Sequence, residues 1–158
     1  MTLRYFVIIL FFIFSCKPIE PVNFIEVKDV KINRSKDDGI FITAQIILEN
    51  PNKVKITINE VDVDIYAEDI VLVSVNDNIP RELKENTEST IDIEGLINVD
   101  NLEKILNQKG LAIILGNEDI GLKFTGKIVA KAYGIKDEIE INYSIETVSY
   151  THLRAHET

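Results

Sequence analysis

The chain contains few of the side chains that usually perform catalysis. Its 158 residues include one cysteine, Cys16, and two histidines, His152 and His156. The histidine spacing suits two metal ligands on one helix face, but no glutamate follows His152 and no further ligand lies nearby in the sequence. Cysteine-, serine- and zinc-based hydrolysis therefore lack their central residues, and we expect no metal site here.

Paired carboxylates could perform acid–base chemistry, since the chain has 26 acidic residues. Asp62 and Asp64 alternate along a predicted strand, which places them side by side on its outward face. A half-buried strand needs polar residues there in any case, so a solvated face is favoured over an acid-dependent hydrolase. Calcium binding by Asp37 and Asp38, or by the run Asn76–Asn78, is disfavoured because such residues are typical of turns and no calcium-loop pattern is present. We expect neither enzyme activity nor a cofactor.

Residues 1–16 have the pattern of an exported protein. Arg4 precedes a continuous apolar run from Tyr5 to Phe14, only half the roughly 20 residues that a membrane-spanning helix needs. A basic start and a short apolar centre are typical of a secretory signal peptide. The string Ile-Phe-Ser-Cys that ends at Cys16 resembles a bacterial lipobox, whose cysteine becomes the acylated first residue of the mature protein. The alternatives are an ordinary signal peptide with a buried cysteine, or an uncleaved hydrophobic tail.

The lipobox resemblance divides the chain into segments. We predict a signal peptide over residues 1–15, then the lipidated cysteine and a tether over 16–23, where prolines keep the chain extended and lift the domain from the bilayer. A single domain is expected over 24–147. The segment 148–158 loses the strand pattern and closely resembles translated sequencing-adapter sequence, so we exclude it as a non-native tail.

Lipidation would hold the protein in a membrane of the bacterial cell envelope, because two or three acyl chains anchor a protein far more stably than one. Lys17 stands where an aspartate would indicate inner-membrane retention, so we favour the outer membrane, with the domain facing the periplasm or the cell surface. The net charge of −9 argues against nucleic acid as a partner and against adhesion to anionic lipid. The acyl anchor is therefore expected to hold the protein on its own.

Hydrophobic and polar residues alternate along most of the remaining chain, as in half-buried strands. The alternation slips at 59–60, which indicates a β-bulge or a bend, and Pro80 favours a sheet edge. One helix is predicted from Asp100 to Gly110, then a short buried run over 111–115, and 134–137 is predicted to join the last two strands. The predicted strands are 24–33, 40–49, 54–66, 70–75, 88–94, 122–133 and 138–146. This pattern predicts an all-β, immunoglobulin- or fibronectin-III-like sandwich of about 7–8 strands with one short helix.

Three stretches of the predicted sandwich carry a family pattern. The stretch 46–52 ends a strand in Asn-Pro-Asn, the next strand carries a valine-rich run over 58–66, and 124–134 contains a glycine within a strand and a glycine turn. Together they resemble the late embryogenesis abundant type 2 domain (LEA-14, or water-stress and hypersensitive-response domain), over about residues 24–146. The resemblance implies a seven-stranded sandwich, no established catalytic residues, frequent lipidation in bacteria and a link to desiccation stress.

Two hypotheses of function follow. The first is a lipid-tethered binding or scaffolding module for a protein or an apolar ligand, with Phe41 and Ile47 as its candidate partner-binding face, because both lie on the otherwise polar side of a long strand. The second is a stress-protective protein that acts by hydration, without a specific partner. An enzyme is a remote third.

Overall fold

The computed structural model describes residues 18–35, 39–114 and 121–145, which form eight strands and one helix. The helix is α2 (Val99–Ile114), and the strands are β1 (Asn23–Ser35), β2 (Gly39–Asn50), β3 (Ile56–Ala67), β4 (Ile70–Asp77), β5 (Arg81–Leu83), β6 (Thr87–Leu96), β7 (Leu122–Ala132) and β8 (Ile135–Ile145). The predicted all-β sandwich with one helix is therefore confirmed.

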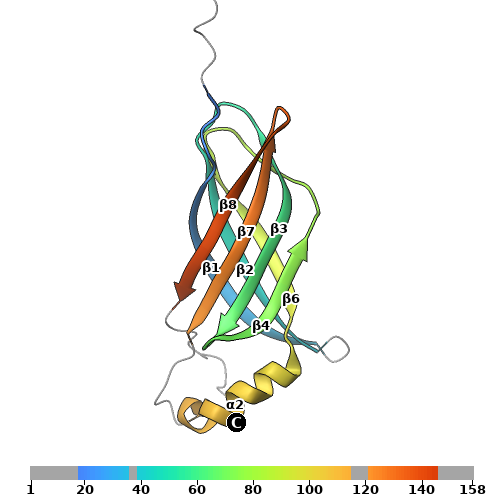
Figure 1. The fold of residues 1–158 in the computed structure, drawn as a ribbon, viewed down its shortest axis with the longest axis vertical. Coiled ribbons are helices and arrows are strands. Elements are labelled where there is room, and N and C mark those ends of the chain that lie inside the picture. Colours follow the sequence, from blue (N-terminus) through green and yellow to red (C-terminus); the bar gives the residue numbers. More distant parts are fainter. Residues whose placement is uncertain (1–17, 36–38, 115–120, 146–158) are drawn as a thin grey trace, which may run out of the picture.

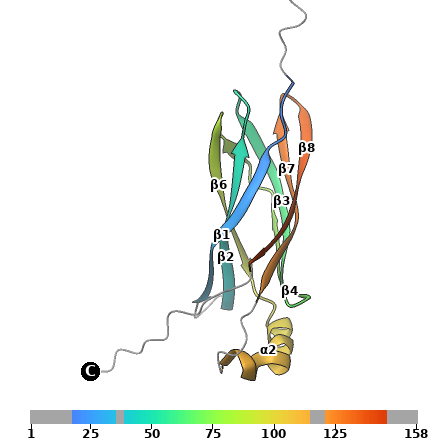
Figure 2. The same cartoon turned by 90° about the vertical axis from the view of Figure 1, so that its left-hand side faces the viewer.

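The strands form two antiparallel sheets that face each other (Figures 1 and 2). One sheet has the order β1-β2-β6, and the other has the order β4-β3-β7-β8 with β5 beside β3. Figure 1 shows α2 at one end of the long axis and the first described residues at the opposite end. We call these the helix end and the tether end.

The core lies between the sheets and follows from the alternation in the sequence. In β2, for example, Ile42, Ala44 and Ile46 are almost fully buried, and in β7 so is Phe124. Burying a side chain of this size contributes about 1.5–3 kcal/mol relative to leaving it exposed. Among the described residues, the buried side chains are apolar except for those of Asn50 and Asn52.

The predicted slip of the alternation in β3 is confirmed as a register shift. Where β3 pairs with β7, Ile58 lies opposite Ala130 and Glu60 opposite Val129, so Asn59 is an extra residue in β3. On its other side, β3 changes partner at the same level: it pairs with β5 before the bulge and with β4 after it.

The break between β4 and β5 contains Pro80 and is held by Asp77. One carboxylate oxygen accepts a hydrogen bond from the backbone N–H of Ile79 at 2.8 Å, and the other forms an ion pair with the guanidinium of Arg81. The Arg81 hydrogen bond, followed by the Ile79 hydrogen bond, lowers the pKa of Asp77 below its usual value. As predicted, the proline adjoins an edge strand, since β5 pairs with β3 alone.

Helix α2 is longer than predicted at both ends. Its cap is Asn98 rather than Asp100, because Asn98 Oδ1 accepts a hydrogen bond from the backbone N–H of Asn101 at 3.0 Å. Gly110 does not end the helix but lies inside it, and the predicted separate run over 111–114 is helical. A glycine inside a helix costs only about 1 kcal/mol, so it does not have to end one.

The helix is fixed to the end of the five-stranded sheet. Asn101 Nδ2 donates to the carbonyl of Val71 at 2.9 Å, and the N–H of Asn98 donates to the carbonyl of Leu72 at 2.9 Å. The side chain of Ile105 is 2% exposed and belongs to the core.

The connection between β7 and β8 is tighter than predicted. The two strands pair up to Ala132 and Ile135, so the turn consists of Tyr133 and Gly134 alone rather than of 134–137. The φ angles of 48° at Tyr133 and 84° at Gly134 are both positive, as in a two-residue type I′ hairpin. The two strands were predicted correctly. The short turn was missed because two-residue turns usually carry Asn-Gly or Asp-Gly, and this one is Tyr-Gly.

Gly126 is expected to be irreplaceable in β7. A Cβ atom there would lie 2.1 Å from the carbonyl oxygen of Asp62 and 2.7 Å from Cα of Val63, both backbone atoms. The Gly126→Ala variant should lose about 2 kcal/mol or more of unfolding free energy in a urea titration. Gly121→Ala is the matched control, because its nearest contact would be an ordinary 3.7 Å. Equal stability of the two variants would contradict this packing.

The Asp77–Arg81 pair should give a small acid-dependent stability. Because folding lowers the pKa of Asp77, its contribution is complete above the unfolded value of about 3.9 and is lost as the pH falls through the folded value. The side chains are 22% and 27% exposed, so we expect only about 0.5–1 kcal/mol. Asp77→Asn should be less stable than the parent by that amount at pH 6 and no less stable near pH 2. A difference independent of pH would contradict it.

Candidate functional site

The predicted partner-binding residues, Phe41 and Ile47, do not form one open patch. Ile47 is 4% exposed and lies between Glu26 of β1 and Thr90 of β6. Phe41 is half-buried and lies opposite Leu96, which is 64% exposed. Ile47 is therefore closed to a partner in this fold, and the role of Phe41 stays a prediction.

Of the other candidate residues, the structure describes the strand carboxylates. Asp62 and Asp64 lie on the outer face of β3, as the alternation predicts, and Asp64 accepts a hydrogen bond from Ser74. Cys16, the histidines and the acidic pair at 37–38 lie outside the described residues. Within the described ranges, no group of three or more His, Cys, Asp or Glu residues gathers as metal ligands would.

Asn50 forms the buried centre of the Asn-Pro-Asn turn. Its Nδ2 donates to the carbonyls of Val54 at 2.8 Å and Lys84 at 3.0 Å. Its Oδ1 accepts from both the backbone N–H and the side-chain Nδ2 of Asn52, at 3.0 and 3.1 Å. Every donor and acceptor of this 0%-exposed amide group is therefore used, and the turn ties the end of β2 to two neighbouring loops.

Asn52 extends this network to the segment that precedes β1. Its Oδ1 accepts from the backbone N–H of Glu20 at 2.8 Å, and its Nδ2 donates to the carbonyl of Glu20 at 2.8 Å. The side-chain amide thus bonds both the N–H and the C=O of one residue, as the backbone of a neighbouring strand would. We call this pair of hydrogen bonds the tether clamp.

The tether clamp shortens the segment that the sequence suggested as a spacer. Glu20 is held, and β1 begins at Asn23, so only the residues between Cys16 and Glu20 could separate the domain from an anchor. Four residue steps of extended chain span at most about 14 Å. A lipid at Cys16 would therefore hold the tether end close to the bilayer.

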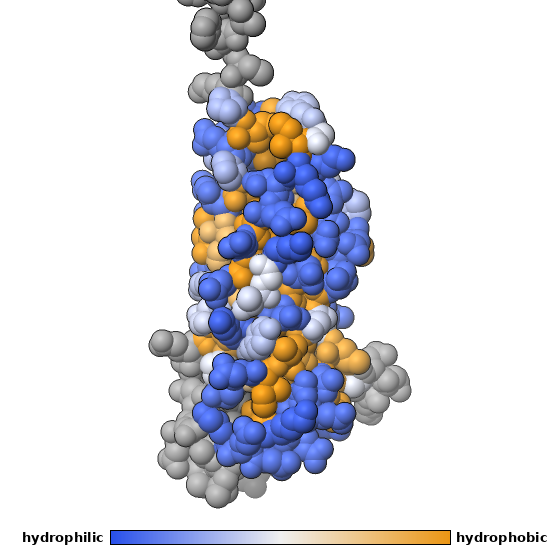
Figure 3. Space-filling model, viewed as in Figure 1, coloured by the Kyte–Doolittle hydropathy of each residue, from blue (hydrophilic) through white to orange (hydrophobic). Residues whose placement is uncertain are grey.

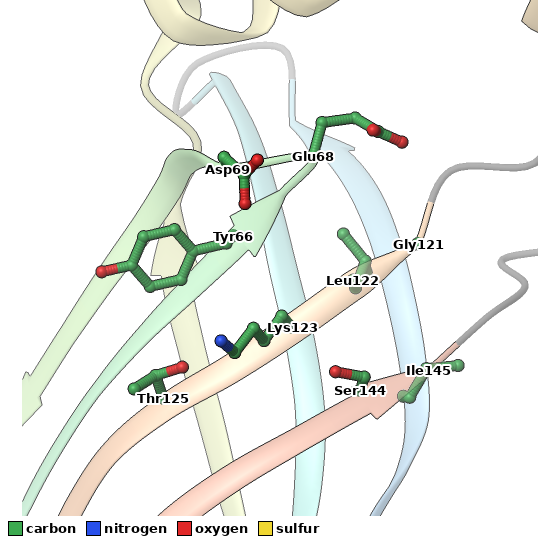
Figure 4. Close-up of a pocket in the computed structure, with 9 residues that line it drawn as sticks. All are labelled: Tyr66, Glu68, Asp69, Gly121, Leu122, Lys123, Thr125, Ser144 and Ile145. Atoms are coloured by element: carbon green, nitrogen blue, oxygen red, sulfur yellow. The ribbon is translucent and has the colours of Figure 1, made fainter.

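A groove lies at the other end of the five-stranded sheet (Figure 4). Its volume is about 450 Å³, and Tyr66, Lys123 and Ser144 line it as one row across β3, β7 and β8. Thr125, next along β7, has a hydroxyl oxygen that is buried without a hydrogen-bond partner within the described structure. Glu68, at the rim, forms an ion pair with Lys109 of α2 at 2.9 Å. The groove is open, and its lining mixes polar and apolar surface, which suits binding.

The tip of the β7–β8 hairpin lies at the tether end (Figures 1 and 2). Tyr133, at the first turn position, is 80% exposed, and Ile135 beside the turn is 63% exposed. A left-handed conformation costs a bulky residue about 1–2 kcal/mol, so Tyr133 is an unfavourable choice for the turn itself.

Comparison with known proteins identifies the family. A sequence model of the late embryogenesis abundant protein family matches residues 45–146, more than half of the chain. The chain belongs to this family. No curated relative matches it significantly.

Two solved structures show the same fold. A crystal structure of a protein from Archaeoglobus fulgidus is 15% identical with a TM-score of 0.59, and the alignment covers 80% of this chain and 98% of that one. A solution structure of a protein from Arabidopsis thaliana is 14% identical with a TM-score of 0.57, and the alignment covers 88% and 92%. Both match over most of their length, so the chain contains nearly the whole fold of each.

The family match includes the residues that carried the resemblance. Asn50 and Asn52 lie within it, as does Gly126, and each has a structural role given above. Glu20, the other half of the tether clamp, lies outside the match. The sequence indicated the Asn-Pro-Asn turn but not its partner, because nothing in the local pattern marks the backbone of Glu20.

Among the described residues, no helix is both long enough and apolar enough to cross a membrane.

Removing the Asn52 side chain should release the tether. Asn52→Ala loses both clamp hydrogen bonds and the bond to Asn50, so we expect a loss of about 1.5–3 kcal/mol and faster hydrogen exchange at the Glu20 amide. Asn78→Ala is the control, since that exposed side chain bonds, within the described part of the chain, only to nearby Asn76. Unchanged exchange at Glu20 in Asn52→Ala would contradict the clamp.

Proposed function

We propose that the chain is a lipid-anchored, non-enzymatic protein of the bacterial cell envelope. Its late embryogenesis abundant domain serves as a binding or scaffolding module held close to the membrane. The acyl groups are attached at Cys16, and the outer membrane is the favoured location, because Lys17 stands where an aspartate would indicate inner-membrane retention.

One observation carries this proposal: the tether clamp fixes Glu20 four residues after Cys16, at the end opposite α2. The buried side-chain amide of Asn52 holds an extended segment. Fixing this segment is useful if the chain just before it is anchored, and it brings no such benefit to a free N-terminus. It also means that the helix end, with the groove, points away from the membrane.

The groove at the helix end supports a binding role. It combines a half-buried aromatic ring, Tyr66, with exposed Lys123 and exposed Ser144. Such a surface suits a polar, extended segment of a partner protein rather than an apolar small molecule. A non-enzymatic role agrees with the family, which is generally non-enzymatic.

The family match also favours a second candidate, stress protection by hydration without a specific partner. The acidic composition, with a net charge of −9, is compatible with it. Crosslinking in intact cells separates the two candidates. A defined partner crosslinked from the groove supports the binding module, whereas loss of survival after drying without any partner supports the second candidate.

Cys16→Ala should abolish acylation. In cells fed a labelled palmitate analogue, the parent should be labelled and remain with the outer membrane after cell breakage, whereas the variant should carry at least about tenfold less label. Lys17→Asp is the matched control, because it keeps the cysteine and should stay labelled while moving to the inner-membrane fraction. An unlabelled parent would overturn the proposal.

A further inference from the structure

The tip of the β7–β8 hairpin and the tether lie at the same end of the sandwich in both ribbon views (Figures 1 and 2). Ile135, next to the tip, and Ile19, in the tether, line the same small cavity of about 30 Å³, so they are neighbours. Figure 3 shows hydrophobic surface gathered at this end, beside the point where the described chain begins. With Tyr133, these side chains form what we call the tip patch.

Charge at the tether end differs from that of the chain as a whole. The described loops there are 18–22, 51–55, 84–86 and 133–134, and their charged residues are Lys53, Lys55 and Lys84 against Glu20 and Glu85. Lys55 is paired with Glu82 of β5 at 2.8 Å, and Asp137 lines the same cavity as Ile135, so this end is close to neutral in a chain whose net charge is −9. The repulsion from anionic lipid that the overall acidity predicts is therefore weaker at this end.

Two features of the hairpin tip are unfavourable for the isolated domain. Tyr133 occupies a left-handed turn position that asparagine would fill with less strain. Lys131 and Lys136 lie directly opposite each other in the register, and both are exposed, although like charges opposite each other destabilise a strand pair. A partner that accepts an aromatic ring and two ammonium groups at once would compensate for the first penalty and relieve the second.

A bilayer surface is such a partner. Tyrosine rings are enriched at membrane–water interfaces, and lysine side chains extend from an apolar contact towards lipid phosphates. The short tether keeps the tip patch near the bilayer, because an acylated Cys16 lies at most about 14 Å from Glu20. The headgroup region of one leaflet is itself about 5–8 Å thick.

We propose that the tip patch docks into the headgroup region of the membrane that holds Cys16, with Tyr133 and Ile135 at the level of the headgroups and the two lysines on anionic phosphates. This inference rests on the proposed acyl anchor and goes beyond it, since it gives the domain a fixed orientation. The helix end then projects into the aqueous space.

The chain has no tryptophan, so a single one reports its own surroundings. Ile135→Trp probes the tip patch, and Leu96→Trp is the matched control, because the two parent side chains are 63% and 64% exposed at opposite ends of the sandwich. The acylated full chain carrying either substitution is reconstituted into vesicles of phosphatidylethanolamine and phosphatidylglycerol, with or without brominated acyl chains.

Docking predicts blue-shifted emission and about threefold or more stronger quenching by brominated lipid for Ile135→Trp than for Leu96→Trp. Adding Lys131→Gln and Lys136→Gln should reduce that quenching in vesicles that contain phosphatidylglycerol. Vesicle flotation is measured in parallel.

Each outcome decides the matter. Protein that floats with vesicles while Ile135→Trp is quenched no more than Leu96→Trp overturns the docking and leaves the anchor intact. Quenching that depends on protein concentration instead of on lipid bromination indicates a second copy on the patch, and also overturns it. Protein that does not float, and carries no acyl group by mass, overturns the proposed function and the docking with it.

Discussion

The hydrogen bonds between the Asn52 side chain and the backbone of Glu20 fix the segment before β1 to the sandwich, and so limit how the domain can be oriented relative to an anchor. Two buried amide groups, Asn50 and Asn52, sit in an otherwise apolar interior, and they are tolerated because their polar atoms are bonded. Without the clamp, the segment before β1 would be a flexible spacer, and the sandwich could take any orientation. With it, the position of an anchor fixes which end faces the membrane.

The two ends of the sandwich are chemically different, and the fold explains why. Long antiparallel strands carry the chain from one end to the other, so each end is built only from turns and the segments that begin or end there. Both ends carry exposed apolar side chains, but the tether end consists of short turns with little net charge. The helix end has α2 and the groove. A tethered binding module requires such a division between an attached end and a presented end.

The sequence predicted whatever depends on local alternation. The strands, the bulge at Asn59 and the edge position next to Pro80 follow from the period-two pattern and from backbone chemistry, and each was found. Features that depend on distant partners were missed or wrong: the cap at Asn98, the helical path through Gly110 and the clamp itself. Ile47 shows the same limit, since neighbouring strands bury an apolar side chain that alternation places on the polar face.

We propose that a short, clamped tether holds the domain against the membrane. Neutron reflectometry of the acylated chain on a supported bilayer measures the water layer between the headgroups and the protein directly. We expect this layer to be thinner than the reach of four extended residues, about 14 Å, and the long axis to stand away from the surface. A wider water layer, or protein density lying flat along the bilayer, would contradict it.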